Sequence, residues 1–123
     1  MRFFAKALVG LMLWGVSVAG AQSIIHIQSP WSSDPAVAAE THYLEVTRNG
    51  VATSYEMTDE GNGWFIYTYA DAISATTTRT FTITAGAETW NESVPLADIL
   101  NYNSGAEVWV YVDASTGAYT LKG

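Results

Sequence analysis

Apolar and polar residues alternate in short segments along most of the chain, and turn-forming residues separate these segments. Alternation with a period of two is typical of β-strands that bury one face. The pattern predicts seven strands, over Ser23–Gln28, Thr41–Thr47, Thr53–Met57, Trp64–Ala70, Arg79–Ala85, Glu107–Val112 and Ala118–Leu121. We therefore predict an all-β fold, an Ig-like β-sandwich of about seven antiparallel strands in a single domain.

Turn-forming residues refine this outline. Asn49-Gly50 is a strong signal for a two-residue hairpin turn. Gly61-Asn62-Gly63 predicts a second turn. The segment Pro95–Leu100 is predicted to form one helical turn.

The alternation also assigns side chains to faces, because successive residues of a strand point to opposite sides. In the second predicted strand, His42 shares a face with Leu44 and Val46. In the sixth, three valines share one face, and Trp109 and Tyr111 take the other. In the fourth, aromatic rings occur on both faces, so the pattern does not decide which face is core.

The N-terminal residues have the features of a secretory signal peptide. Arg2 and Lys6 form a basic head, a short apolar run follows, and Ala19-Gly20-Ala21 fits a small-residue cleavage site. The apolar run is too short to span a bilayer. We predict a signal peptide over 1–21 and one domain over 22–123, with a secreted or periplasmic location and no membrane span.

The net charge and the absence of cysteine exclude some classes of partner and reaction. Removal of the signal peptide takes away two of the five basic residues, so the formal net charge changes from −7 to −9 and only Arg48, Arg79 and Lys122 remain. A surface this acidic argues against nucleic acid or anionic lipid as a partner. Without cysteine the chain has no disulfide and no thiol chemistry. A neutral partner fits best.

Neither catalysis nor metal binding has a clear sequence signal. The only histidines are His26 and His42, and the part after residue 21 has no nucleophile elbow. Asp59-Glu60-Gly61-Asn62 offers oxygen atoms to calcium, but its spacing is not that of an EF-hand loop, and an ordinary polar turn is the simpler interpretation. We predict a protein that is not an enzyme and has no metal and no cofactor.

Aromatic residues exceed what a small core needs. The rings after residue 21 include Trp31, Trp64, Trp90, Trp109, Tyr43, Tyr55, Tyr67, Tyr69, Tyr102, Tyr111 and Tyr119. We expect some of them at the surface, where a ring can cover the apolar face of a sugar while polar neighbours bind its hydroxyl groups. Trp90 is the strongest candidate, because it precedes the polar run Asn91-Glu92-Ser93.

Several motifs together resemble the starch-binding carbohydrate-binding modules of families 25 and 26. In chain order they are Ser29-Pro30-Trp31, His42-Tyr43, Tyr55-x-Met57, Glu60-Gly61-Asn62-Gly63-Trp64-Phe65-x-Tyr67, Phe81-x-Ile83-x-x-Gly86 and Trp90-Asn91. The resemblance implies a β-sandwich that stacks α-glucans on aromatic rings. By matching position, it implies a site of His42, Tyr55, Trp90 and Asn91, whereas the strand with Trp64 is mainly structural. The chain departs from the family in having Tyr55 where a Trp is usual, which leaves open a changed ligand or a scaffold that has lost binding.

These observations predict a secreted, non-catalytic module that binds the polysaccharide α-glucan, such as starch or glycogen, alone or beside a separate secreted amylase. Two alternatives stay open: a structural or protein-interaction β-sandwich of the cell envelope, and an inhibitor of a secreted glycosidase. Sugar binding as implied requires an exposed Trp90 near His42 and Tyr55. A structural role requires a buried Trp90, or the three rings scattered over the surface.

Overall fold

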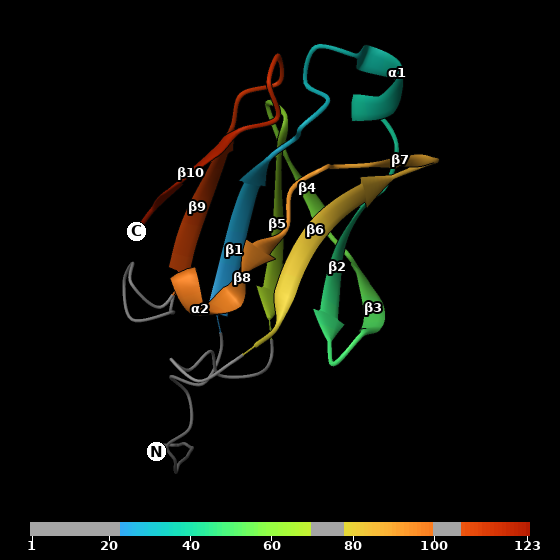
Figure 1. Cartoon of the computed structure of the whole chain (residues 1–123). Coiled ribbons are helices and arrows are strands. Elements are labelled where there is room, and N and C mark those ends of the chain that lie inside the picture. The colour runs from blue at the N-terminus through green and yellow to red at the C-terminus, as the bar shows by residue number, and fades with distance from the viewer. Residues whose placement is uncertain (1–22, 70–77, 100–106) are drawn as a thin grey trace, which may run out of the picture.

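The computed structural model describes residues 23–69, 78–99 and 107–123, which form two β-sheets packed face to face (Figure 1). The strands are β1 (Ser23–Gln28), β2 (His42–Arg48), β3 (Val51–Glu56), β4 (Thr58–Gly61), β5 (Trp64–Tyr69), β6 (Thr80–Ala85), β7 (Glu88–Thr89), β8 (Val94–Pro95), β9 (Glu107–Val112) and β10 (Tyr119–Lys122). The helices are α1 (Pro35–Ala38) and α2 (Leu96–Ile99). The predicted signal peptide over 1–21, and the predicted ends Ala70 and Leu100, lie outside the described residues.

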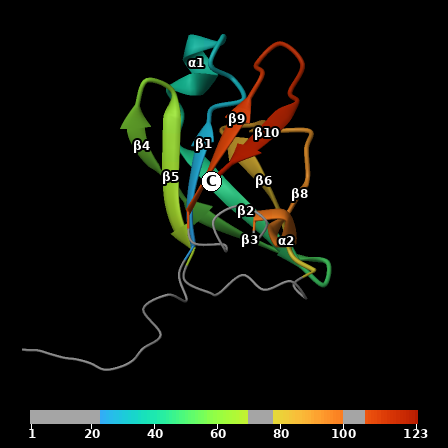
Figure 2. The ribbon, with the colours of Figure 1, turned by 90° about the vertical axis from the view of Figure 1, so that its left-hand side faces the viewer.

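The strands are shared between two sheets. Sheet A has the order β10-β9-β1-β5-β4, and Figure 2 shows its strands side by side. Sheet B has the order β3-β2-β6-β7, and β8 also pairs with β6. All pairs are antiparallel except β1 and β9, which are parallel.

The predicted all-β sandwich is confirmed, with more strands than expected. The described residues form ten strands, and the three that were not predicted are β4, β7 and β8. These have four, two and two residues, which is too short for alternation to be visible in the sequence. The predicted helical turn is confirmed as α2.

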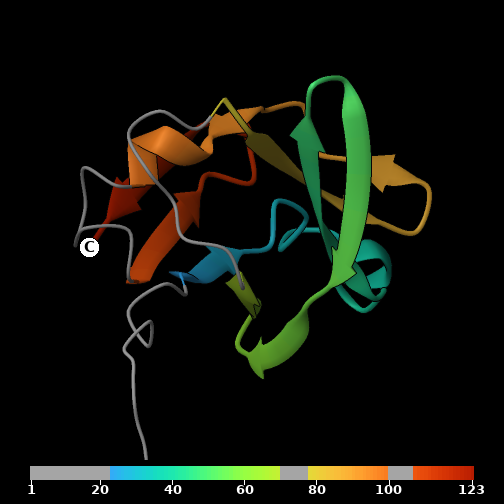
Figure 3. The ribbon, with the colours of Figure 1, turned by 90° about the horizontal axis from the view of Figure 1, so that it is seen from below.

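The core lies between the two sheets. Its buried side chains include Ile25, Ile27, Phe65, Val108 and Val110 from sheet A, and Leu44, Val46, Phe81 and Ile83 from sheet B. Figure 3 looks along the sandwich from below, with β9 and β10 on one side and the β2–β3 hairpin on the other. The faces assigned by alternation in β2 and β9 are confirmed, because their valines and leucine are buried and Tyr111 is exposed.

Two hairpin turns have the backbone conformation that their sequences require. Asn49 and Gly50 join β2 to β3 with φ of 53° and 79°, and Asn62 and Gly63 join β4 to β5 with φ of 57° and 82°. Asn and Gly tolerate positive φ, which is why these pairs form tight turns. The ladder between β4 and β5 shifts register just before the second turn, so Glu60 is an extra residue with no partner on β5.

No helix in the part of the chain that the structure describes is both long and apolar enough to cross a membrane.

Candidate functional site

Trp90 is buried, so the expectation that it is exposed for stacking is wrong. Its exposed fraction is 4%. The indole Nε1–H donates a hydrogen bond of 2.9 Å to the carbonyl of Gly117, and the ring meets Tyr119 edge-on. Its backbone N–H donates to Ile83, and its carbonyl accepts from the hydroxyl of Thr82. Trp90 therefore joins the segment after β7 to the turn before β10.

His42 is also part of the core, with an exposed fraction of 0%. Its ring stacks on Phe65 of sheet A, with centroids 3.8 Å apart. Nδ1 lies 2.8 Å from the carbonyl oxygen of Glu40, which can only accept, so Nδ1 carries the proton. Nε2 then accepts from the hydroxyl of Ser29 at 2.8 Å. Both ring nitrogens are occupied within the protein, and no sugar can reach them.

The remaining predicted residues do not complete a site around these two. Tyr55 is half-buried on β3 and packs at a tilt against Tyr67. Asn91 is exposed beside Trp90. Sheet B separates the two ends of the predicted site, because β3 and β7 are its opposite edges. At a strand spacing of about 4.8 Å, Tyr55 and Trp90 lie roughly three strands apart. The structure does not bring the four residues together on one open surface.

A different set of aromatic rings lies on the outward side of sheet A. We call it the aromatic face and define it by Trp64, Trp109, Tyr111, His26 and Glu60. The strand register arranges most of it in two rows. His26 on β1 lies opposite Trp109 on β9, and the neighbouring row runs from Trp64 on β5 toward Tyr111 on β9. The rings of Trp64 and Tyr111 meet edge-on, with centroids 5.0 Å apart.

The aromatic face is hollowed and partly open to solvent. The hollow measures about 450 Å³ and is lined by His26, Glu60, Gly61, Asn62, Trp64, Trp109 and Tyr111. Tyr111 is 40% exposed, and both tryptophans are half-buried. Apolar ring surface therefore lies beside carboxylate and amide groups, which is the combination that sugar binding needs.

His26 is buried at the base of the aromatic face, where two carboxylates hold its ring. Its Nδ1 lies 2.8 Å from a carboxylate oxygen of Glu60, and its Nε2 lies 2.6 Å from one of Glu107. Its ring lies parallel to that of Trp109, with centroids 4.6 Å apart. The bulge before the β4–β5 turn frees Glu60 for this contact. The imidazole thus ties three strands of sheet A together through side chains.

The surroundings shift the pKa values of the two histidines in opposite directions. Burial lowers the pKa of His26, but the hydrogen bonds and negative charges of Glu60 and Glu107 outweigh it, so the net pKa is raised above 6.5. Burial lowers the pKa of His42 below 6.5, although the Glu40 carbonyl and the charge of Asp59 oppose this. His26 therefore favours its charged form and His42 its neutral form.

Reasoning from the sequence found part of the aromatic face but did not assign these rings to a site. Alternation placed Trp109 and Tyr111 opposite the core valines, which is confirmed for β9. The resemblance assigned a mainly structural role to the strand with Trp64, yet this ring points outward into the hollow. The contact of Glu60 with His26 had no sequence signal, because it depends on a bulge and on β1 and β5 being neighbours.

No protein-family model matches the chain, and neither the curated proteins nor the solved structures include a significant match to it. The resemblance to families 25 and 26 stays a prediction.

We expect the two imidazoles to titrate on opposite sides of pH 6.5. A raised pKa in the folded state means that His26 contributes stability below pH 6.5, and that this contribution is lost as the pH rises through its folded pKa. A lowered pKa means that the contribution of His42 is present above pH 6.5 and is lost as the pH falls toward its folded pKa. NMR titration of the two ring Cε1–H signals measures both midpoints. Midpoints in the reverse order would contradict the assigned contacts.

We expect Trp90→Ala to lower the free energy of unfolding by about 3–5 kcal/mol, because it empties a buried site the size of an indole. Trp90→Phe keeps most of the ring but loses the bond to Gly117, and it should cost about 1–2 kcal/mol. Urea unfolding measures both values, and Asn91→Ala at the exposed neighbouring position is the control, with a change within about 0.5 kcal/mol. A Trp90→Ala variant as stable as the unchanged protein would show that this ring is not a core residue.

Proposed function

We propose that this chain is a secreted, non-catalytic carbohydrate-binding module that binds a neutral polysaccharide on the aromatic face of sheet A. The observation that carries the proposal is the group of three partly open rings around one hollow, Trp64, Trp109 and Tyr111. The resemblance implies α-glucan as the ligand class, and a separate secreted amylase is the partner that such a module would assist. The proposed site replaces the one that the resemblance implies, which consists of His42, Tyr55, Trp90 and Asn91.

In this proposal the rings supply apolar contact with the sugar, and the polar groups supply hydrogen bonds. The open parts of the indoles and of Tyr111 cover the apolar C–H face of a pyranose. Covering roughly 100 Å² of apolar surface gains about 2.5 kcal/mol before costs. The carboxylate of Glu60 has acceptor capacity beyond its bond to His26, and the exposed amide of Asn62 both donates and accepts.

A module of this kind binds weakly at each site. Two rings and a few hydrogen bonds give a net binding free energy of roughly −5 to −7 kcal/mol, which corresponds to a Kd of about 0.2 mM to 10 μM. The negative charge of the chain, −7 over its full length, also favours an uncharged ligand over a polyanion at this acidic face.

A second candidate function is the binding of another protein through the same surface. It is favoured by the burial of Trp90, which is what a structural or protein-interaction sandwich requires. Exposed Trp and Tyr side chains are also common anchors of protein interfaces. The two functions differ in whether a pure polysaccharide is retained by the isolated chain.

We expect affinity gel electrophoresis to show retardation of the protein by soluble starch or glycogen, compared with a gel that contains no polysaccharide. Tyr111→Ala and Trp64→Ala should weaken binding by about 2 kcal/mol, or roughly 30-fold, because each removes one stacking ring. Tyr43→Ala is the matched control, since Tyr43 is 36% exposed on the outward side of sheet B. It should bind like the unchanged protein.

Equal mobility in starch, glycogen, β-glucan and polysaccharide-free gels would overturn the proposal and leave the protein-interaction function. Retardation by β-glucan alone would support the aromatic face as a sugar site and reject α-glucan as the ligand. Retardation that Tyr43→Ala reduces as much as Tyr111→Ala does would place binding outside the aromatic face.

A further inference from the structure

The outer strand β3 presents an open edge of sheet B. Within the part of the chain that the structure describes, β3 pairs with β2 on one side and with no strand on the other. Five of its six residues are exposed. Val51 is 66% exposed, more than any other large apolar side chain among the described residues. This strand therefore leaves both backbone groups and apolar surface in contact with water.

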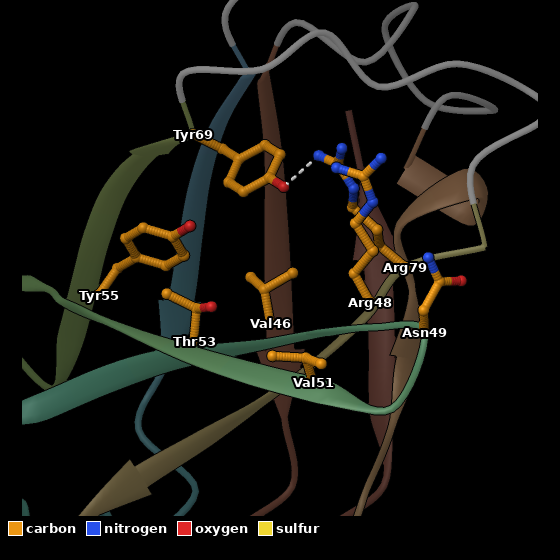
Figure 4. A pocket seen from close by; sticks show the side chains of 8 residues that line it. All are labelled: Val46, Arg48, Asn49, Val51, Thr53, Tyr55, Tyr69 and Arg79. Carbon is orange, nitrogen blue, oxygen red and sulfur yellow. Dashed lines mark hydrogen bonds between the residues drawn. The ribbon is translucent and has the colours of Figure 1, made fainter.

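The inward side of β3 is also left uncovered. The register places Tyr55 opposite Leu44 and Thr53 opposite Val46, and both β2 residues are buried in the core. The side chains of Val51, Thr53 and Tyr55 therefore point to the core side of sheet B. They line a hollow of about 360 Å³ instead of packing under sheet A, and Figure 4 shows them along the strand. A side that would normally be core is thus open along β3.

The other outer strands carry features that discourage pairing with another chain. β4 has a bulge and the acidic residues Asp59 and Glu60, β7 has only two residues, and the four-residue β10 carries Lys122. Short length, bulges and charged side chains are the usual means of protecting a sheet edge. β3 has six residues in a regular ladder, with no proline, and its single charge, Glu56, is at its end. Among the described edges, β3 is the one suited to strand addition.

The ladder with β2 shows which backbone groups of β3 face the open side. The N–H of Met57 donates to the carbonyl of His42 at 2.9 Å, one step beyond the last pair of the ladder. Hydrogen-bonded and non-hydrogen-bonded pairs alternate along an antiparallel ladder. Every second residue counted back from Met57 therefore bonds to β2. The residues between them, Ala52, Ser54 and Glu56, direct their N–H and C=O groups to the open edge.

This edge is complementary to itself in one antiparallel register. When Thr53 of one copy lies opposite Thr53 of another, Ala52 lies opposite Ser54, so these residues can exchange backbone hydrogen bonds. On the core side, Val51 of each copy then lies opposite Tyr55 of the other. Pairs of a β-branched with an aromatic residue, and pairs of threonines, are favourable across strands. The exposed Val51 gains an apolar neighbour in this arrangement.

We propose that β3 is a dimerisation edge, where a second copy of this chain pairs antiparallel with Thr53 opposite Thr53. The two copies are related by a two-fold axis, as is usual for homodimers. The pairing joins the two B sheets into one continuous sheet. Glu56 then lies opposite Gly50, so no like charges meet across the new ladder even though the chain is acidic.

The proposed dimer has a consequence for binding. A two-fold axis perpendicular to the joined sheet places both A sheets on the same side of it, so the two aromatic faces point the same way. Two weak sites held together on one polymer bind more tightly than either alone. This consequence rests on the proposed function, whereas the pairing of the β3 edges does not.

Sedimentation equilibrium of the exported protein without any sugar tests the proposal, from roughly 1 μM to roughly 1 mM, the range in which weak interfaces associate. We expect the apparent molar mass to double as the concentration rises. Ser54→Pro should abolish this increase, because proline removes an N–H that faces the open edge. Ser54→Ala keeps the N–H and should behave like the unchanged protein. ¹H–¹⁵N NMR spectra at low concentration check that each variant is folded.

Charge changes at Thr53 test the register. Thr53→Lys and Thr53→Glu should each weaken self-association at least about 5-fold at low ionic strength, because like charges then lie directly opposite each other. An equal mixture of the two variants should restore the dimer. Thr89→Lys, at an exposed threonine on the other edge of sheet B, is the matched control and should associate like the unchanged protein.

A monomer at every concentration would overturn the proposal. A dimer that persists in Ser54→Pro and Thr53→Lys would place the interface elsewhere and also overturn it. Two folded Thr53 variants that stay monomeric when mixed would overturn the register. Since no sugar is present, each of these results is independent of whether the aromatic face binds a polysaccharide.

Discussion

The two sheets of this chain are held together by packing between their facing side chains, because the sequence contains no cysteine that could join them. This constraint determines where the aromatic rings go. His42 of sheet B stacks on Phe65 of sheet A. Trp90 is hydrogen-bonded to Ile83 of β6 and to Gly117 in the turn before β10. Rings that could stack on a sugar are used inside the sandwich instead. The surface that is open for binding must then be built from side chains on the outward side of a sheet.

The period of the strands predicted more of the molecule than the resemblance did. Alternation placed His42 on the same face as Leu44 and Val46, and all three are buried. The resemblance placed His42 in a sugar site, and the strand period already argued against that position. Local pattern was reliable here because a residue of a strand cannot change faces without shifting the whole register. Trp90 gave no such signal, because it lies outside any strand long enough to show a period.

Side-chain contacts between strands that are distant in the sequence could not be predicted from the sequence. Glu60 reaches His26 only because β4 carries a bulge and β1 and β5 are neighbours in sheet A. The residue types were visible in the sequence, and the contact between them was not.

The most direct test of the central claim is a two-dimensional ¹H–¹⁵N NMR titration of the protein with a neutral α-glucan oligosaccharide, following the indole N–H signals. Each tryptophan gives its own signal, so one experiment compares the aromatic face with the buried ring. We expect the signals of Trp64 and Trp109 to shift on binding, while that of Trp90, bonded to the Gly117 carbonyl, stays in place. A shift confined to Trp90, or no shift at any indole at millimolar oligosaccharide, would contradict binding at the aromatic face.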